Sequence, residues 1–506
     1  MKLTLDQRRA AYTAERLSYI EAVPGSGKTT IASERFGYLR YSLRDSRGVI
    51  ALAYNRAACA ELVHRIDARW GSRCVTDMHC VMTFDELYRD ILNFLLHRSL
   101  ISWIGSPVVD VRENYRGLKG FRTVRKKEKA FLCFAIVDEN RQIKSVSRRV
   151  DGPAAGISKK KDHTNALAEG IVSHDDVRSI IHSALSDEAL VDEVQNWLCR
   201  RYRAFIVDEV FDLNSLDVDI VKLAVGSDLV VSLIGDPWQT LYGWRGAKPK
   251  LVNEMVNTVC ASSSGTQSFV RFEQSASFRF SGNQQIRLVT DLRRGLGVDL
   301  PLVTSSEVDV ILSRRWRDLL DCGDNVLPLA LGAVRNQVLA SLNLFLNSLT
   351  RRYFNCNSIK RDEALAVLGI SIENFEPLQD KAFCGLQDRL YRGESPDSVF
   401  DDLLLLIKEL KGGSKPPVKN HSRSEYVTCL EELGKRLRFD SVVPGITVFQ
   451  AKGREWDRVG VAVVQEDLKR FAVGISPFAG DKFDAEACIL YVAITRGRLL
   501  SGYILL

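Results

Sequence analysis

Residues 21–30 read Glu21-Ala22-Val23-Pro24-Gly25-Ser26-Gly27-Lys28-Thr29-Thr30. The apolar run from Leu17 to Ala22 predicts a buried strand, and the run from Thr29 to Leu39 predicts the helix that follows it. Glycines at positions 25 and 27 would let the backbone amides curl round phosphate oxygens at the start of that helix, where the helix dipole favours negative charge. An ordinary glycine-containing turn between a strand and a helix is the alternative.

The side chains of this loop predict a bound nucleoside triphosphate with its metal ion. Lys28 would reach the β and γ phosphates of ATP, and the Thr29 hydroxyl would ligate Mg²⁺. Ala22 stands where the strict motif has glycine. The residues predicted to hold the nucleotide here are Gly25, Ser26, Gly27, Lys28, Thr29 and Thr30.

A second stretch, Phe205-Ile206-Val207-Asp208-Glu209, ends an apolar run with two carboxylates. This pattern suits a buried parallel strand that delivers both acids to the C-terminal edge of a sheet. There Asp208 can hold the metal, while Glu209 orients and deprotonates the attacking water. Alternatively, two acids after a strand can have a structural role, in which the first caps the start of a helix and the second adds a negative charge to its first turn. Their combination with Lys28 favours the catalytic role.

The stretch from Gly235 to Ala247 combines polar groups and aromatic side chains in one turn. Gln239 and Arg245 are its candidates for sensing ATP, and Tyr242 and Trp244 are its candidates for stacking on bases. The polar surroundings of Trp244 favour exposure, and a core aromatic is the alternative. One loop would therefore respond to both nucleotide and nucleic acid.

Length and composition bound the class of protein. The 506 residues are too many for one ordinary core, and the 45% hydrophobic and 26% charged fractions describe a soluble globular chain. The net charge of +7 permits a nucleic-acid partner without establishing one. We find no run of eighteen apolar residues, and the start leads into a polar helix rather than a signal peptide, so we expect a cytoplasmic protein without membrane contact.

The eleven cysteines are scattered without a Cys-x-x-Cys pair. The closest cluster is Cys74, His79 and Cys80, whose spacing is poor for zinc. Isolated buried thiols in a reducing compartment are the simpler explanation.

Strand candidates alternate with helical stretches in two sets, which predicts two α/β domains with parallel sheets. A helix from Pro396 to Leu410, with Ser395 as N-cap and Gly412-Gly413 as its stop, precedes a predicted hinge. The first strand set is Leu17–Ala22, Val49–Ala53, Phe205–Val207 and Leu229–Ile234; the second is Phe269–Phe272, Val326–Leu331, Ile446–Phe449, Val459–Val464 and Tyr503–Leu506.

Between Leu87 and Trp197 the pattern changes and cations accumulate, which indicates an insertion. Tyr115 and Phe121 lie among these cations, so a surface that tracks a nucleic-acid backbone and a solvated loop face are alternatives of equal weight. The cations are Arg112, Arg116, Lys119, Arg122, Arg125, Lys126, Lys127, Lys129, Arg148, Arg149, Lys159, Lys160 and Lys161.

Taken in order, these stretches resemble the UvrD/Rep type of superfamily 1 helicases. The resemblance implies an α/β fold with two RecA-like parallel-sheet domains and a P-loop NTPase core. Residues 1–84 and 196–262 would form the first of these domains, and residues 85–195 an inserted accessory domain. Residues 263–340 and 430–506 would form the second, and residues 341–429 a reduced helical insertion.

Further residues take roles from this resemblance alone. The start Thr4-Leu5-Asp6-Gln7 resembles the family's glutamine motif, in which Gln7 reads the adenine edge; a capping box between Thr4 and Gln7 is compatible with that role. The segment Ala53–Ala58, with Asn55, and the segment Thr76–Phe84, with His79, resemble DNA-contacting segments.

The second half of the chain supplies three more residues by the same resemblance. Arg279, in Ser277–Ser281, is similar to the phosphate-sensing arginine. Glu455 would face the ATP sugar, and Arg496 would be the arginine finger. Two lobes would then grip the triphosphate from opposite sides.

The activity implied is ATP-driven translocation or unwinding on single-stranded or tailed DNA, in the 3′ to 5′ direction. Phe211 and Phe449 stand where the family has Gln and His, at positions that couple ATP to DNA, so altered coupling is expected.

The short interval from Arg279 to Thr447, with Arg335-Asn336-Gln337, resembles the helicase subunit of the bacterial Gabija anti-phage system. That resemblance implies a role in defence and a nuclease partner of the OLD-family, TOPRIM type. A subunit that senses nucleotide and DNA ends but unwinds little by itself, and a stand-alone repair helicase, are the alternatives.

Overall fold

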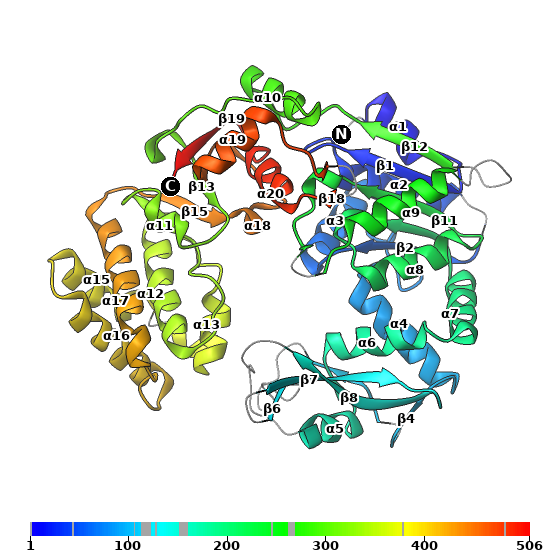
Figure 1. Cartoon of the computed structure of the whole chain (residues 1–506), viewed down its shortest axis with the longest axis horizontal. Coiled ribbons are helices and arrows are strands. Elements are labelled where there is room, and N and C mark those ends of the chain that lie inside the picture. The colour runs from blue at the N-terminus through cyan, green and yellow to red at the C-terminus, as the bar shows by residue number, and fades with distance from the viewer. Residues whose placement is uncertain are drawn as a thin grey trace. The chain divides into compact units, whose positions relative to one another are not determined.

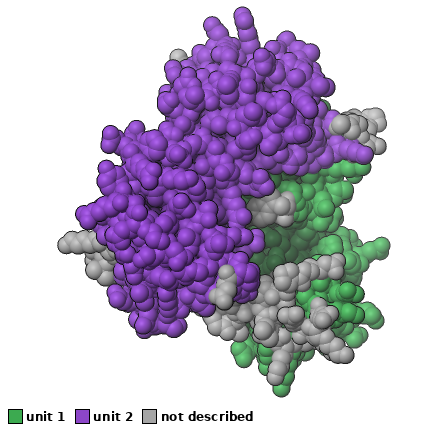
Figure 2. All heavy atoms as spheres, turned by 60° about the vertical axis from the view of Figure 1, so that its left-hand side comes forward, with its two compact units in different colours: residues 1–277 green, residues 278–506 purple. Residues whose placement is uncertain are grey.

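A computed structural model describes residues 3–42, 45–105, 107–112, 123–126, 129–150, 160–243, 246–261, 269–376, 379–479 and 482–506 (Figure 1). The chain divides into two compact units, Met1–Ser277 and Phe278–Leu506, which Figure 2 shows in green and purple. Each unit contains its own parallel sheet. The predicted α/β class with two parallel-sheet domains is therefore confirmed.

The first unit is built on a six-stranded sheet of order β12-β1-β11-β10-β2-β3, with every pair parallel. β2 (Gly48–Ala53) and β10 (Tyr202–Val207) are buried at every residue, as strands covered on both faces must be. They are flanked by β1 (Leu17–Ala22), β11 (Val230–Gly235) and β3 (Cys80–Thr83). The carboxyl ends of these strands share one edge, where the predicted site residues follow them.

Two apolar cores cover the faces of this sheet. One contains Ile31 and Phe36 of α2 (Lys28–Ser42) and Leu62 of α3 (Arg56–Trp70). The other is larger and continues into the insertion. Its helices are α4 (Phe84–His97), α6 (His174–Ala184), α7 (Glu188–Arg201), α8 (Ser215–Val225) and α9 (Pro249–Ala261).

One strand lies in a different sheet from the one predicted. β12 (Phe269–Gln274) pairs in parallel with β1 at the edge of the first sheet, so its assignment to the second domain is wrong. The compact units accordingly part after Ser277 rather than after residue 262. The physical reason is that the sheet to which an edge strand belongs is decided by the strand with which it pairs. The residues of β12 by themselves favour a strand in either sheet.

The insertion leaves the first unit through α4 and returns through α6. Its four-stranded sheet has the order β4-β8-β7-β6, and β7 (Lys129–Val137) pairs antiparallel with β8 (Gln142–Val150). Much of the cation-rich stretch, including Tyr115, Phe121 and the lysines at 127 and 159, falls outside the described residues. The remaining elements are α1 (Leu5–Ala11), β4 (Ser102–Trp103), β5 (Asp110–Val111), β6 (Thr123–Lys126), α5 (Lys160–Ala168), β9 (Ile171–Val172), η1 (Val210–Asp212) and η2 (Pro237–Gln239).

The second unit has a five-stranded parallel sheet of order β14-β15-β13-β16-β19. Its central strand β13 (Val310–Ser313) was not predicted. The predicted strand Ile446–Phe449 is shifted, because Thr447 caps a short helix with Gln450 and ends the strand there. The elements are β14 (Val326–Pro328), β15 (Val443–Thr447), β16 (Trp456–Val463), β19 (Gly497–Leu505), α10 (Asn283–Arg293), α11 (Asp318–Asp321), α18 (Val448–Ala451), α19 (Gln465–Val473) and α20 (Ala485–Ile494), with η4 (Ser305–Glu307), β17 (Phe478–Ala479) and β18 (Lys482–Phe483).

A helical subdomain fills the interval between β14 and β15. The predicted helix at Pro396 is α16 (Pro396–Lys411), and Gly412 ends it in the left-handed conformation at φ +60°. Ser395 precedes it without a side-chain cap bond. The other helices are α12 (Gln337–Phe354), α13 (Arg361–Leu368), α14 (Ile372–Phe375), α15 (Gln379–Tyr391), α17 (Asn420–Lys435) and η5 (Arg436–Arg438). Within the described residues, none of the helices has the length and apolar character needed to cross a bilayer.

Candidate nucleotide and nucleic-acid site

The phosphate-binding loop joins β1 to α2. Gly25 and Gly27 hold φ angles of +75° and +86°, which residues with a Cβ adopt only at a cost. A Cβ at Gly27 would lie 2.9 Å from the Gln7 side-chain nitrogen. The Ser26 hydroxyl donates to the Val23 carbonyl at 2.8 Å and closes the turn. The loop therefore has the backbone shape that a phosphate cradle requires.

Gln7 packs directly against this loop. Its backbone N–H and side-chain Oε1 form the predicted capping box with Thr4, and its Nε2 donates to the Ser26 carbonyl at 2.8 Å. The side chain is buried. The structure thus holds the Gln7 amide beside the loop, whereas its contact with adenine stays a prediction.

Lys28 and Glu209 meet at the carboxyl edge of the sheet. The Lys28 ammonium lies 3.9 Å from a Glu209 carboxylate oxygen and 3.4 Å from the Ala22 carbonyl, to which it donates. Both side chains keep some exposure, 10% for Lys28 and 27% for Glu209. The left-handed backbone of Glu209, at φ +55°, costs on the order of 1 to 3 kcal/mol in a non-glycine residue. Such a conformation is typical of functional turns.

Asp208 and Gln239 complete this edge from two neighbouring strands. Asp208 is buried, and its carboxylate accepts a hydrogen bond from the Glu209 N–H at 3.0 Å. The Gln239 amide donates to buried Asp236 at 2.8 Å, which fixes its orientation. The Asp208 carboxylate and the Thr29 hydroxyl are oxygen ligands of the kind that a hard cation such as Mg²⁺ prefers, and their joint role as its ligands stays a prediction. Among the described residues, no group of three or more His, Cys, Asp or Glu side chains is arranged to hold a metal.

Thr30 is turned towards a different element. Its hydroxyl accepts a hydrogen bond from Arg65 of α3 at 2.9 Å. α3 begins beside Asn55, so one rigid helix joins the phosphate loop to the predicted DNA-contacting segment.

The predicted DNA-contacting segment Ala53–Ala58 and the predicted base-stacking loop Gly235–Ala247 meet at Tyr54 and Tyr242. Their rings are stacked, with centroids 4.5 Å apart and an interplanar angle of 10°. Asn55 caps α3 by accepting the Ala58 N–H at 2.8 Å. Trp244 and Arg245 lie outside the described residues. This partly exposed aromatic pair follows the carboxyl ends of β2 and β11 and offers a surface on which a base could stack.

His79 lies away from this group, at the amino end of β3. Its Nδ1 accepts the Val49 N–H at 3.1 Å, and burial, followed by Arg40 and Arg203, lowers its pKa to about 4. The carboxyl end of β3 is Thr83, which caps α4 in a box with Glu86. The structure therefore places Thr83, and not His79, on the edge shared with Tyr54. The capping-box spacing from Thr83 to Glu86 was the signal that could have found it.

A cavity of about 220 Å³ opens where α3, α4 and α6 begin. Two arginines, a histidine and two carboxylates line it together with two valines. Sequence reasoning missed it because its lining comes from four separate segments. The lining residues are Arg56, Asp85, Glu86, Arg89, Val111, His174 and Val177.

In the second unit, Arg279 and Glu455 form an ion pair. The Arg279 Nε lies 2.8 Å from a Glu455 oxygen, and its Nη1 donates to the Thr495 carbonyl at 3.0 Å. Burial lowers the pKa of Arg279, and Glu455 opposes that shift. Arg496 is 1% exposed and donates to the Val492 carbonyl and the Thr495 hydroxyl. The three residues predicted for the second unit are therefore neighbours.

Parallel α/β architecture, a glycine-shaped phosphate loop and carboxylates at the same sheet edge define a protein with a P-loop nucleotide-binding core. The sequence matches the family described as UvrD/REP helicase N-terminal domain over residues 3–166 and 154–259, about half of the chain. The chain belongs to the UvrD/REP helicase family.

Individual relatives are distant. The ATP-dependent DNA helicase Rep of Salmonella typhimurium is 23% identical over 261 residues, which are 49% of this chain and 38% of Rep. The ATP-dependent DNA helicase UvrD2 of Mycobacterium tuberculosis is 24% identical over 402 residues, 68% of this chain and 53% of UvrD2. A probable DNA helicase II homolog of Mycoplasma pneumoniae is 22% identical over 278 residues, 50% of this chain and 37% of the homolog. The chain thus spans about a third to a half of the length of these relatives.

Proposed function

We propose that the protein is an ATP-dependent DNA helicase or translocase of the UvrD/Rep type. The observation that carries this proposal is the pairing of Lys28 with Glu209 at 3.9 Å beside the phosphate loop. An ammonium and a candidate general base at one sheet edge are the groups that hydrolysis of a triphosphate requires.

Each residue of the first unit has a chemical task in this proposal. Lys28 binds the phosphate oxygens, and its present partner Glu209 is released to orient and deprotonate water. Thr29 and Asp208 hold Mg²⁺, which supplies neutralising charge for the phosphates when bound. Gln239, oriented by Asp236, senses the γ phosphate, and Arg245 acts with it.

The second unit contributes arginines in this proposal. Arg279 leaves Glu455 for phosphate, and Glu455 then faces the ATP sugar. Arg496 acts as the arginine finger, a group that contributes about 10³ to 10⁵ in rate in related phosphoryl transfer. Binding of ATP would in this way favour one arrangement of the two units, and hydrolysis another.

DNA is the proposed track. Tyr242, stacked on Tyr54, offers a ring to an unpaired base, and Trp244 and Asn55 act beside it. Stacking of this kind tolerates any base sequence. By family resemblance the movement runs 3′ to 5′ on single-stranded or tailed DNA in the cytoplasm.

Steady-state ATP hydrolysis with and without single-stranded DNA tests the proposal. We expect turnover that rises with DNA and is lost in Lys28→Ala. Unwinding of duplexes with a 3′ or a 5′ tail then reports the direction. If the parent and Lys28→Ala both show no ATP hydrolysis, with or without DNA, the proposed ATPase activity would be excluded.

A defence role is the finer proposal. It is supported by the resemblance to the Gabija helicase subunit and by the single helical subdomain, α12 to α17, between Arg279 and Thr447. The partner would be an OLD-family, TOPRIM-type nuclease. Co-purification from the native operon tests it, and a monomer that unwinds long duplexes unaided counts against the alternative of a regulatory subunit with little unwinding of its own. Neighbouring repair genes would favour a stand-alone repair helicase.

A further inference from the structure

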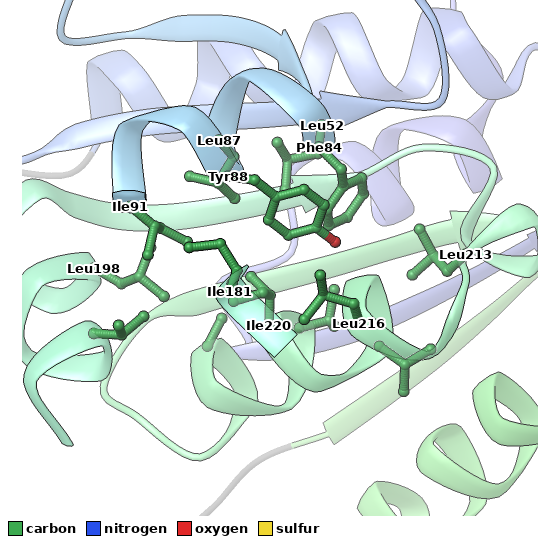
Figure 3. Close-up of a cluster of buried hydrophobic side chains, with 14 of the residues drawn as sticks. Leu52, Phe84, Leu87, Tyr88, Ile91, Ile181, Leu198, Leu213, Leu216 and Ile220 are labelled. Carbon is green, nitrogen blue, oxygen red and sulfur yellow. The ribbon is translucent and has the colours of Figure 1, made fainter. Parts of the chain in front are cut away.

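A buried hydrogen bond joins Tyr88 of α4 to Asp217 of α8. The Tyr88 hydroxyl donates to an Asp217 carboxylate oxygen, and both residues are buried, at 0% and 4% exposure. Figure 3 shows the Tyr88 ring among apolar side chains that include Leu87, Leu216 and Ile220. A polar contact in such surroundings holds one geometry, because breaking it leaves an unpaired polar group without water.

Asp217 also organises the start of α8. It accepts the Asn214 N–H at 2.9 Å, and its own N–H donates to the Asn214 side chain at 3.1 Å. This reciprocal capping box fixes the backbone at Asn214. The carboxylate therefore has one oxygen on Tyr88 and the other on the chain that leads into α8.

That chain comes directly from Glu209. The Asp212 N–H donates to the Glu209 carbonyl at 2.9 Å, and the Leu213 N–H donates to the Val210 carbonyl at 3.3 Å. Lys248, which follows the Tyr242 loop, donates its N–H to the Leu213 carbonyl at 2.7 Å. The left-handed Glu209 persists only if such contacts hold the turn around it.

The Tyr88 end of this hydrogen bond is connected to the insertion. Tyr88 lies on α4, the helix through which the chain enters the insertion. Asp85, one turn earlier, binds Arg178 of the returning helix α6 through two hydrogen bonds of 2.8 Å. The two connecting helices are thus tied together beside Tyr88.

We infer that Tyr88 and Asp217 are positioning residues that fix the Glu209 turn to the helix of the insertion and so hold Glu209 in the alignment needed for hydrolysis. This inference rests on the proposed ATPase function. It assigns the insertion an influence on the chemical step through one buried contact.

The charge of Asp217 gives the contact a measurable signature. Burial raises the pKa of Asp217 to about 6, against the lowering effects of the Tyr88 hydroxyl, the Asn214 N–H and Arg178, while Asp85 adds to the rise. The ionised carboxylate receives a charge-assisted bond from Tyr88, roughly twice as strong as a neutral one. Protonation reverses this bond and weakens the hold on the turn.

Asp217→Asn isolates this charge. The amide can accept the Asn214 N–H and donate to the Tyr88 oxygen, so both hydrogen bonds survive in a form that does not titrate. We expect the parent kcat to fall as the pH drops through about 6. The variant should have a kcat roughly fivefold lower at neutral pH, with an unchanged KM for ATP and no inflection near that pH.

Tyr88→Phe removes the donor while the ring still packs, and we expect a similar loss of kcat. Tyr202→Phe is the matched control, because Tyr202 is also buried in the first unit and its hydroxyl accepts hydrogen bonds from Arg201 and Cys80 rather than from the Glu209 turn. The double variant of Tyr88 and Asp217 should lose no more than either single variant. An Asp217→Asn enzyme with the parent's kcat and pH profile, or an equal loss in Tyr202→Phe, would overturn the inference.

A parent without any ATP turnover would count against the proposed function and still leave the contact testable. Because the folded pKa of Asp217 is raised from 3.8 to about 6, the free energy of unfolding should fall as the pH rises between these values. Asp217→Asn should lack that component in urea titrations. Its persistence in the variant would show that Asp217 is not the group concerned and would end the inference.

Discussion

The candidate nucleotide-binding residues of the first unit and those of the second unit differ in exposure and in the partners that they contact. In the first unit, Lys28 and Glu209 are partly exposed and stand 3.9 Å apart beside a loop already curled for phosphate. In the second unit, Arg496 is 1% exposed and bound to carbonyl and hydroxyl groups of its own helix end. Arg279 is likewise held by Glu455.

Under the proposed function, this difference predicts that the first unit binds the nucleotide before the second unit does. In that proposal the first unit would accept a triphosphate by exchanging one ion pair, whereas the arginines of the second unit would have to give up neutral and ionic partners before they could act. Hydrogen bonds to a charged group contribute about 1.5 to 3 kcal/mol each, so the exchange needs the strong compensation that a polyphosphate offers.

The largest effect on ATP hydrolysis is expected from Arg496→Lys in the second unit. If Arg496 leaves its helix for phosphate, loss of the planar guanidinium should lower kcat by about 10³- to 10⁵-fold. The partly exposed Arg314, paired with Asp467 at 2.6 Å elsewhere in the second unit, gives the matched control Arg314→Lys. Equal losses in the two variants, with intact folding by circular dichroism, would place Arg496 in the structure of the second unit only.

Glu209→Gln tests the candidate residues of the first unit. The amide keeps the size of the side chain but cannot take a proton, so kcat should fall by about 10²- to 10⁴-fold while ATP binding is retained. Fluorescent nucleotide titration and single-turnover hydrolysis separate the two effects. A matching loss of nucleotide affinity would contradict the assignment of Glu209 as base.

Tyr242→Ala tests whether the aromatic pair of the first unit binds single-stranded DNA. Loss of one stacking ring should weaken single-strand binding by on the order of 1 to 3 kcal/mol, with basal ATP hydrolysis unchanged. Fluorescence anisotropy with a labelled oligonucleotide measures it. A variant that melts early but binds normally when folded would mean that the Tyr54–Tyr242 stack serves packing alone.

His79 lies at the amino end of β3, opposite the carboxyl ends of the strands where the other candidate residues of the first unit lie. Its pKa is lowered from 6.5 to about 4, so the folded protein holds it neutral and stability should be lost as the pH falls from 6.5 towards 4. His79→Asn retains an acceptor for the Val49 N–H and should remove that pH dependence in urea titrations. Oligonucleotide binding should not change, and a large loss of binding would restore the DNA-contact role.

The smallest expected effect comes from Phe449→His, which restores the family's usual residue beside Thr447. We expect DNA stimulation of ATP hydrolysis to rise by about two- to fivefold, a coupling of about 0.5 to 1 kcal/mol. Phe439→His, at another partly exposed phenylalanine of the second unit, is the control. No change in the ratio of stimulated to basal rates would show that Phe449 does not limit coupling.

Local patterns predicted much of this fold. The strand Leu17–Ala22 was predicted to the residue, and α16 ends at Gly412 as its glycine indicates. Local patterns did not predict those strands whose position depends on contacts with residues far away in the sequence. β13 has only four residues and no distinctive flanks, and β12 is assigned by its pairing with β1. His79 was predicted from the resemblance of the segment Thr76–Phe84, and the structure places it at the amino end of β3, where its DNA contact stays a prediction.

By itself the sequence determined the phosphate loop, the capping box at Thr4 and the carboxylates after β10, because each depends on residues a few positions apart whose backbone preferences are local. Only the tertiary structure decided that Lys28 faces Glu209, that Tyr54 stacks on Tyr242 and that Tyr88 holds Asp217. These contacts join residues far apart in the chain. Sheet order, register and core packing bring them together, and no short segment encodes those properties alone.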